Sequence, residues 1–141
     1  MNLLKHTVIL LFTTSVSLTA FAKPNMQNQN MFNTQTVETV KGEIKTLDTC
    51  KKDGKEMPMG VCFTLKTQTN NLSIHVGPSW YLANKNFKLN IGDKLEVTGS
   101  KVTLNKEFFI IAKELKRDTL TLKLRDENGF PLWSKGKRNN R

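Results

Sequence analysis

The sequence has 141 residues, 38% hydrophobic and 8% aromatic, and its 22 Lys+Arg against 12 Asp+Glu give a formal net charge of +10. This length supports one compact domain and excludes two full catalytic domains. The mean hydropathy of −0.42 excludes a polytopic membrane protein. The excess of positive charge predicts attraction to polyanions or anionic surfaces.

Residues 1–22 have the composition of a cleaved signal peptide. Lys5 gives a positively charged N-terminal region, and an apolar stretch begins at Val8. Ala20-Phe21-Ala22 places small residues at the positions that signal peptidase recognises. Several Ser and Thr residues between 13 and 19 make this segment too polar for a spanning helix. We therefore expect an exported chain, periplasmic or secreted, that starts at Lys23 and has no transmembrane segment.

Both ends of the mature chain have the composition of flexible tails. Residues 23–35 are dominated by Asn and Gln, and residues 134–141 carry four positive charges and no acid. The leader has too little apolar surface to offset the entropy lost on ordering. We expect a flexible leader at 23–35, one folded domain at 36–133 and a solvated basic tail at 134–141.

Apolar and polar residues alternate through most of the domain, which is the period of β-strands. The predicted strands cover residues 37–48, 61–66, 72–76, 95–104, 108–112 and 120–124. Gln68-Thr69-Asn70-Asn71 predicts a hairpin turn, Gly99 a bulge or bend, and the continuous apolar run 108–112 a strand covered on both faces.

One short helix is predicted at 78–85, where Pro78 and Ser79 provide a helix start. Three strands, one helix and two or three further strands follow the order of an OB-fold. The sequence therefore predicts an all-β fold: an OB-fold barrel of five to six strands, closed or partly open, with one short helix. A β-sandwich needs about seven strands, which this chain does not offer.

Three stretches resemble small exported bacterial OB-fold proteins, a loosely characterised family of envelope and secreted domains. These stretches are residues 75–82 (His-Val-Gly-Pro-Ser-Trp-Tyr-Leu), 92–100 and 124–133, within a run that covers about two-thirds of the chain. The resemblance implies the OB-fold and a binding role. It carries over no catalytic residue, since the glycines and aromatic residues of these stretches are structural.

Cys50 and Cys62 are the two cysteines of the chain. In an exported protein a lone pair predicts a disulfide, here closing the loop of residues 51–61 and stabilising the fold by ~3 kcal/mol. The alternatives are a metal site or a redox centre. A zinc site takes four ligands and the mature chain adds only His75, and the spacing is not Cys-x-x-Cys. We expect neither a metal nor another cofactor.

The sequence offers no evident catalytic machinery. The acidic residues Glu43, Asp93, Glu96 and Asp126 are scattered over predicted turns and strand edges, and no nucleophile motif is present. His75 could act as a base or a pH-sensitive contact, but we expect a solvent-facing residue beside Ser73. We therefore predict a protein that is not an enzyme.

Three large aromatic residues are expected to be structural. Trp80 and Tyr81 lie on the predicted helix, where we expect them to close one end of the barrel, not to stack on a ligand. Trp133 is expected to close the opposite end.

OB-folds bind on the face of their second and third strands and on the flanking loops. The candidate ligand-binding residues there are Lys51, Lys52, Lys55, Lys66 and His75. We expect a binding module of the envelope or secretome that contacts a protein partner, an anionic glycan or lipid headgroups.

The alternative is a sequence-independent binder of polyanions or nucleic acid. Further basic residues surround the last strands: Lys113, Lys116, Arg117, Lys123 and Arg125. Single-strand binding uses aromatic platforms, however, and no aromatic residue occupies the outward positions of strands two and three.

Overall fold

The computed structural model describes residues 31–52, 55–104 and 106–134, with the backbone alone at 51–52 and 55–59. The predicted signal peptide, most of the leader and residues 135–141 of the basic tail lie outside the described residues. Among the helices that are described, none has the length and apolar character needed to cross a membrane.

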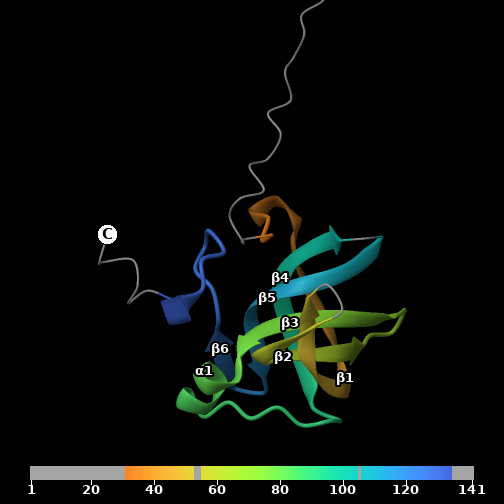
Figure 1. The fold of residues 1–141 in the computed structure, drawn as a ribbon. Helices are drawn as coiled ribbons and strands as arrows, with labels where there is room; N and C mark the ends of the chain where they lie inside the picture. The colour runs from red at the N-terminus through yellow and green to blue at the C-terminus, as the bar shows by residue number, and fades with distance from the viewer. Residues whose placement is uncertain (1–30, 53–54, 105, 135–141) are drawn as a thin grey trace, which may run out of the picture.

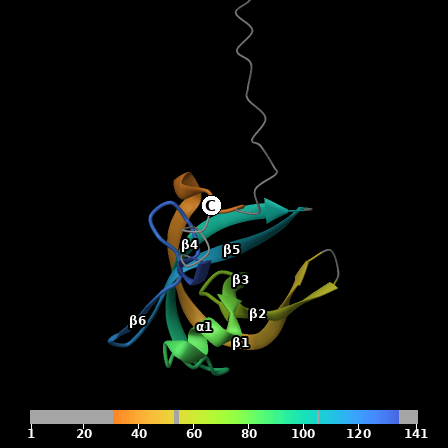
Figure 2. The ribbon, with the colours of Figure 1, turned by 60° about the vertical axis from the view of Figure 1, so that its left-hand side comes forward.

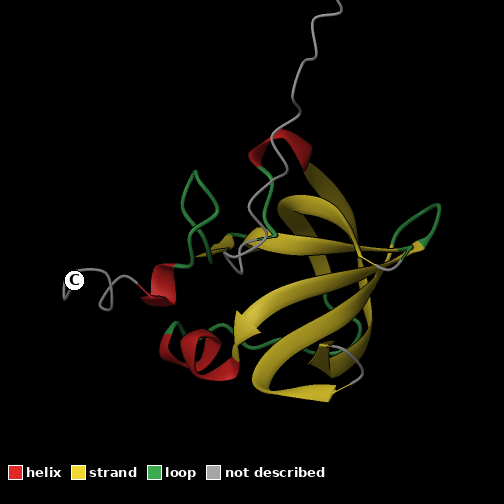
Figure 3. Cartoon of the chain, turned by 45° about the horizontal axis from the view of Figure 1, so that its top comes forward, coloured by secondary structure: helices red, strands yellow, loops and turns green. Residues whose placement is uncertain are grey.

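The described residues form six strands, one short α-helix and two 3-10 turns, the second at residues 132–134 (Figures 1 and 3). In chain order the elements before this second turn are η1 (Thr34–Thr36), β1 (Val37–Lys52), β2 (Lys55–Lys66), β3 (Asn71–Pro78), α1 (Ser79–Asn84), β4 (Lys94–Leu104), β5 (Glu107–Arg117) and β6 (Leu120–Lys123). This order agrees with the predicted all-β architecture with one helix between the third and fourth strands.

The first five strands close into a barrel. The strands are ordered β3-β2-β1-β4-β5-β6, and β3 also pairs with β5, so the sheet returns on itself while β6 extends it as an extra strand (Figure 1). The β3–β5 pairing is parallel and the others are antiparallel. A five-stranded barrel with this strand order and a helix between β3 and β4 is an OB-fold, as predicted.

Closure depends on a bend in β1. This strand pairs with β4 from Val37 to Glu43 and with β2 from Glu43 to Lys52. Gly42 lies at the crossing, where an added Cβ would stand 2.3 Å from the carbonyl oxygen of Lys66. Only glycine permits so close an approach of two backbones.

The barrel interior is filled by the apolar residues of the alternating pattern. The buried residues that point inward include Ile44, Phe63, Leu65, Ile74, Val76, Leu95, Val97, Ile110, Ala112 and Leu115. Each strand therefore buries one face in a single shared core, which is the burial that the period-two alternation predicts.

Helix α1 closes one end of this core through Tyr81, whose hydroxyl donates to the carbonyl of Lys123 at 3.0 Å. Trp80 is 43% exposed, so the expectation that both aromatic residues plug the barrel holds for Tyr81 alone. Successive residues of a helix point in different directions, so one helix turn cannot bury both. Trp133 packs on Tyr81 with 5.5 Å between ring centroids, which corrects the expected position of Trp133 at the opposite end.

The β1–β2 hairpin is longer than predicted. Residues 51–61, expected as a loop, are mostly strand, and the ladder runs to the pair Lys52–Lys55. Residues 57–60 form a bulge in β2 between the pairs Thr49–Val61 and Lys51–Glu56. This bulge contains Pro58, which has no N–H to donate and interrupts the alternation from which strands are predicted.

Three local details also differ from expectation. The N-cap of α1 is Pro78, with no side-chain cap, so Ser79 does not cap the helix. Phe108, at the start of the run expected to be covered on both faces, is 60% exposed. Part of the expected flexible leader contacts the barrel, because the backbone N–H of Asn33 donates to Ser100 Oγ at 2.9 Å.

Candidate functional site

The candidate site is the outer face of β2, β3 and β5. Register places Cys62 beside His75, and His75 beside Ile111, in one row across the three strands. The neighbouring Phe63 and Ile74 point into the core, so this row lies on the outside of the barrel. In Figure 2 the β1–β2 and β4–β5 hairpins both extend to the right-hand side of the barrel, away from β6. This is the face on which OB-folds bind ligands.

His75 lies at the centre of this face and stacks on Phe109, with ring centroids 4.2 Å apart and an angle of 22° between the rings. It is half-buried, which corrects the expectation of a solvent-facing residue. Burial lowers the pKa of His75 below 6.5, and the positive charge of Arg125 lowers this pKa further. Both effects favour the neutral form of the ring.

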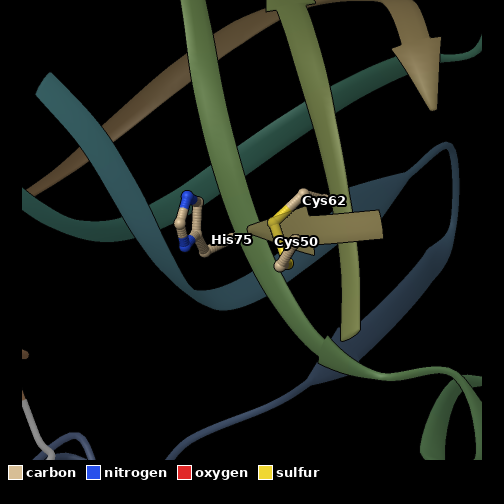
Figure 4. Close-up of side chains that lie close together, drawn as sticks. All are labelled: Cys50, Cys62 and His75. Atoms are coloured by element: carbon tan, nitrogen blue, oxygen red, sulfur yellow. A yellow bond between two sulfur atoms is a disulfide. The ribbon is translucent and has the colours of Figure 1, made fainter. Parts of the chain in front are cut away.

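The disulfide predicted between Cys50 and Cys62 is present, with 4.9 Å between the two Cα atoms. It joins β1 to β2 toward the tip of the long hairpin, and both cysteines are buried. His75 lies next to it on β3, so adjacent strands contribute the three side chains (Figure 4). The two Sγ atoms and a ring nitrogen of His75 all lie within 4.8 Å of one another.

Arg125 connects β3 and β5 just beyond the last pair of their ladder, behind this row. Its Nη1 donates to the carbonyl of Val76 at 3.2 Å and to the carbonyl of Ala112, and its guanidinium lies 5.0 Å from the ring centroid of Trp133. Burial lowers the pKa of Arg125 to about 10, so the group stays charged at pH 7. Arg125 is thus part of the scaffold, which corrects its expected role in contacting phosphates.

Other basic residues of the last strands are also engaged within the chain. Arg117 pairs with Asp93 at 2.9 Å, Lys113 with Glu127 at 2.7 Å, and Lys116 with Glu114 at 3.8 Å. Fewer basic residues of the last strands are therefore available to a ligand than the sequence predicts. Of this group, Lys123 is exposed and has no ion pair among the described residues.

The lysines predicted to contact a ligand lie in two separate regions of the β1–β2 hairpin. Lys66 is exposed at the far end of β2 and pairs in register with Glu43, four residues along the strand from Cys62. Lys51, Lys52 and Lys55 lie at the end of the β1–β2 hairpin, and their side chains lie outside the described part of the chain.

The β4–β5 hairpin carries features that the sequence analysis missed. Leu104 and Phe108 are 41% and 60% exposed, and Lys101 Nζ lies 5.2 Å from the ring centroid of Phe108. Lys106 is exposed in the turn and has a positive φ of 67°. The available signal was the polar turn Asn105-Lys106 between two apolar runs, which marks a hairpin tip where apolar residues can stay exposed.

A groove of about 880 Å³ lies beside α1. Its lining is partly polar, and its apolar lining residues are Leu47, Val61, Leu82, Ala83, Phe87 and Leu89. Neither Lys66 nor His75 lines it.

Stacking on Phe109 and contact with the disulfide hold the side chain of His75 at the centre of the outer face. Among the described residues, the ring of His75 has no hydrogen-bond partner. Phe109 and the disulfide make this surface partly apolar.

These observations define a small OB-fold domain with a disulfide beside its outer face. The MamS/MamX magnetosome protein family matches residues 36–122, and the chain belongs to this family. The structure has the OB-fold that the resemblance to exported bacterial proteins implies. The family that the comparison identifies is a family of magnetosome proteins. No curated protein matches the chain.

Among solved structures, the chain is similar to one in the crystal structure of the S. pombe Stn1-ten1 complex. The two share 16% sequence identity with a TM-score of 0.43, over 65% of this chain and 60% of that chain. This chain thus spans less than two-thirds of the length of that protein.

Proposed function

We propose that this chain is an exported, non-enzymatic binding module that holds an anionic partner on the outer face of β2, β3 and β5. The partner is an acidic protein segment, an anionic glycan or a set of lipid headgroups. The observation that carries the proposal is the His75–Phe109 stack, which lies at the centre of the face that OB-folds use for binding.

The distribution of charge supports an anionic partner at the two hairpins. Residues 31–134 contain 16 Lys+Arg and 12 Asp+Glu, so this part of the chain has a net charge of only +4. Several of its cations are paired with acidic residues: Lys41 with Glu96, Lys116 with Glu114 and Arg117 with Asp93. Lysines remain on the β1–β2 hairpin at 51, 52 and 55, and on the β4–β5 side at 101 and 106.

Export is supported by two independent features. The disulfide requires an oxidising compartment, which the cytoplasm does not normally provide. Residues 1–22 have the composition of a cleaved signal peptide. Together with membership of a magnetosome protein family, they favour a site of action outside the cytoplasm, in the periplasm, in a compartment continuous with it or in the medium.

A second candidate function is single-stranded nucleic-acid binding. The aromatic platform that strands two and three lack is partly supplied by β5, because Phe109 stacks beside His75. Phe108 is exposed at the adjacent hairpin and has Lys101 over its ring. Bases stack on such side chains without sequence preference.

The proposal is tested by titrating the mature protein with heparin, single-stranded DNA and anionic liposomes over a range of salt concentrations. Replacing Lys51, Lys52 and Lys55 with Glu should weaken binding about tenfold or more and reduce its salt dependence, since each neutralised charge contributes to the slope. Removing the tail after Ser134 should weaken binding less, because a flexible tail loses part of each contact to ordering entropy.

The matched control reverses three exposed lysines at the α1 end and the start of β4: Lys85, Lys88 and Lys94. Replacing these three lysines with Glu changes the net charge by the same amount, but at a site away from the outer face. Equal weakening by the control, or loss of all binding on tail removal alone, would contradict the proposed face. Binding of DNA that is lost in Phe109→Ala, with heparin binding unchanged, would favour the nucleic-acid function.

A further inference from the structure

The cluster of Cys50, Cys62 and His75 contains the ligand types that borderline metal ions prefer. Zinc is bound by cysteine thiolates and by the neutral imidazole of histidine. Both cysteines are buried and His75 is half-buried, and all three come from adjacent strands of the closed barrel. In the disulfide the two sulfurs are not ligands, so the oxidised protein holds at most the imidazole.

We propose that reduction of the Cys50–Cys62 disulfide creates a Cys₂His site for Zn²⁺ or an ion of similar preference. The two thiolates and a ring nitrogen of His75 bind the ion, and the fourth position stays open to solvent or to an added ligand. The earlier expectation of no metal rested on the need for four protein ligands. Three protein ligands suffice where the fourth position is left open.

The positions of the ligand atoms fit this geometry after small shifts. Zinc takes sulfur at about 2.3 Å and nitrogen at about 2.0–2.1 Å, so tetrahedral ligand atoms lie roughly 3.5–3.8 Å apart. The two sulfurs and a nitrogen of His75 already lie within 4.8 Å of one another. Once the S–S bond is broken, movements of about 1–2 Å bring all three atoms to bonding distance.

The residues around Cys50, Cys62 and His75 also favour metal binding by the reduced protein. Cys62 and His75 face each other across the β2–β3 ladder, so the barrel fixes their separation. Stacking on Phe109 restricts the imidazole ring. Two thiolates cancel the charge of a divalent ion, and a neutral complex can be buried at little electrostatic cost.

The chemistry balances with a dithiol as the reductant. Two electrons and two protons pass from the dithiol to the protein, the Cys50–Cys62 bond breaks to give two thiols, and the dithiol becomes a disulfide. The ion then displaces both thiol protons into solvent and binds the thiolates without changing its own oxidation state. Reoxidation would expel the ion, so the redox state of the disulfide controls whether the site exists.

The test is a Co²⁺ titration of the mature protein, prepared without a histidine tag, in its oxidised form and after anaerobic reduction. The reduced protein should show thiolate-to-cobalt charge-transfer absorption and the visible bands of tetrahedral cobalt, and Zn²⁺ should abolish both. The oxidised protein should show neither. Absence of the charge-transfer band from the reduced protein would overturn the proposal.

The role of His75 is tested separately. His75→Ala should weaken Co²⁺ binding by at least about tenfold and change the visible bands, whereas Thr64→Ala, on the same face two residues from Cys62, should change neither. Should His75→Ala fail to fold, the ring nitrogens of His75 can be followed by NMR in the unmodified protein, because His6 is the other histidine of the sequence and precedes the mature chain. A ring signal that Zn²⁺ leaves unshifted in the reduced protein would exclude His75 as a ligand.

Discussion

Arg125 joins β3 to β5 at the point where their own pairing stops. The parallel ladder ends at the pair His75–Ile111, and the carbonyls of the next residues, Val76 and Ala112, accept hydrogen bonds from the guanidinium. Trp133 covers the other side of the guanidinium. One side chain therefore completes the closure of the barrel and places a positive charge behind the candidate site.

Replacing Arg125 with Met should lower the free energy of unfolding by about 2–4 kcal/mol, because two charge-assisted hydrogen bonds to buried backbone are lost. Denaturation in urea measures this loss. Lys123→Met, which changes an exposed residue of β6, should stay within about 0.5 kcal/mol of the unmodified protein. Equal stabilities of the two variants would show that Arg125 does not hold the strands together.

His75 should make stability depend on pH in the oxidised protein. Its pKa is lowered in the folded state, so below pH 6.5 the unfolded chain takes up a proton that the folded chain does not. The free energy of unfolding should therefore fall as the pH drops from 7.5 through 6.5 toward the lowered pKa. His75→Gln should lack this part of the pH dependence. An NMR titration of the ring with a midpoint at or above 6.5 would contradict the burial described here.

At the scale of elements, the disulfide joins the two strands of the long β1–β2 hairpin a few residues from its tip. Cys50 and Cys62 are joined beside the bulge that interrupts the ladder, so the covalent bond acts where hydrogen bonding is incomplete. The hairpin beyond it carries Lys51, Lys52 and Lys55. The disulfide thus limits the positions that these lysines can take relative to the outer face.

Replacing both cysteines with Ser should lower the free energy of unfolding by ~3 kcal/mol. The barrel should still form, because its core is made of other residues. Thermal unfolding and circular dichroism measure the two effects. Alkylation and mass spectrometry of the native protein should find no free thiol, and two alkylatable thiols in protein isolated from the periplasm would contradict the disulfide.

At this scale, the sequence predicts those features that depend only on residues close together along the chain. Alternation located the strands, Thr67–Asn70 forms the turn between β2 and β3, and the register shift between β4 and β5 falls at Gly99. Contacts created by barrel closure could not be predicted. Phe109 reaches His75 only because β5 pairs with β3, and no local pattern indicates this pairing.

Contacts that form only on barrel closure also explain why the basic residues of the last strands were wrongly expected to be unpaired. Lys and Arg residues along β5 and β6 look unpaired in the sequence. In the folded barrel Arg117 pairs with Asp93, and Arg125 donates to backbone carbonyls of β3 and β5. The position of Trp133 was missed for a related reason. Its ring lies against Gly77, where an added Cβ would stand 2.6 Å from it, so a glycine in β3 determines where the end of the domain packs.

For the whole molecule, the net charge of +10 is divided between the barrel and the ends of the chain. Residues 31–134 carry +4, and residues 135–141, with four Lys+Arg and no acid, carry another +4. A polyanion could therefore be attracted by the tail alone. The central claim is more specific, because it places the partner on the outer face between the two hairpins.

The measurement that tests this claim most directly is an NMR titration of the mature, oxidised protein with heparin, following every backbone amide. We predict that the largest shifts fall on the outer face and its hairpins, at Ser73, His75, Phe109, Lys101 and the 51–55 segment. Shifts confined to residues 135–141, or centred on the groove beside α1 at Leu82 and Phe87, would contradict the account.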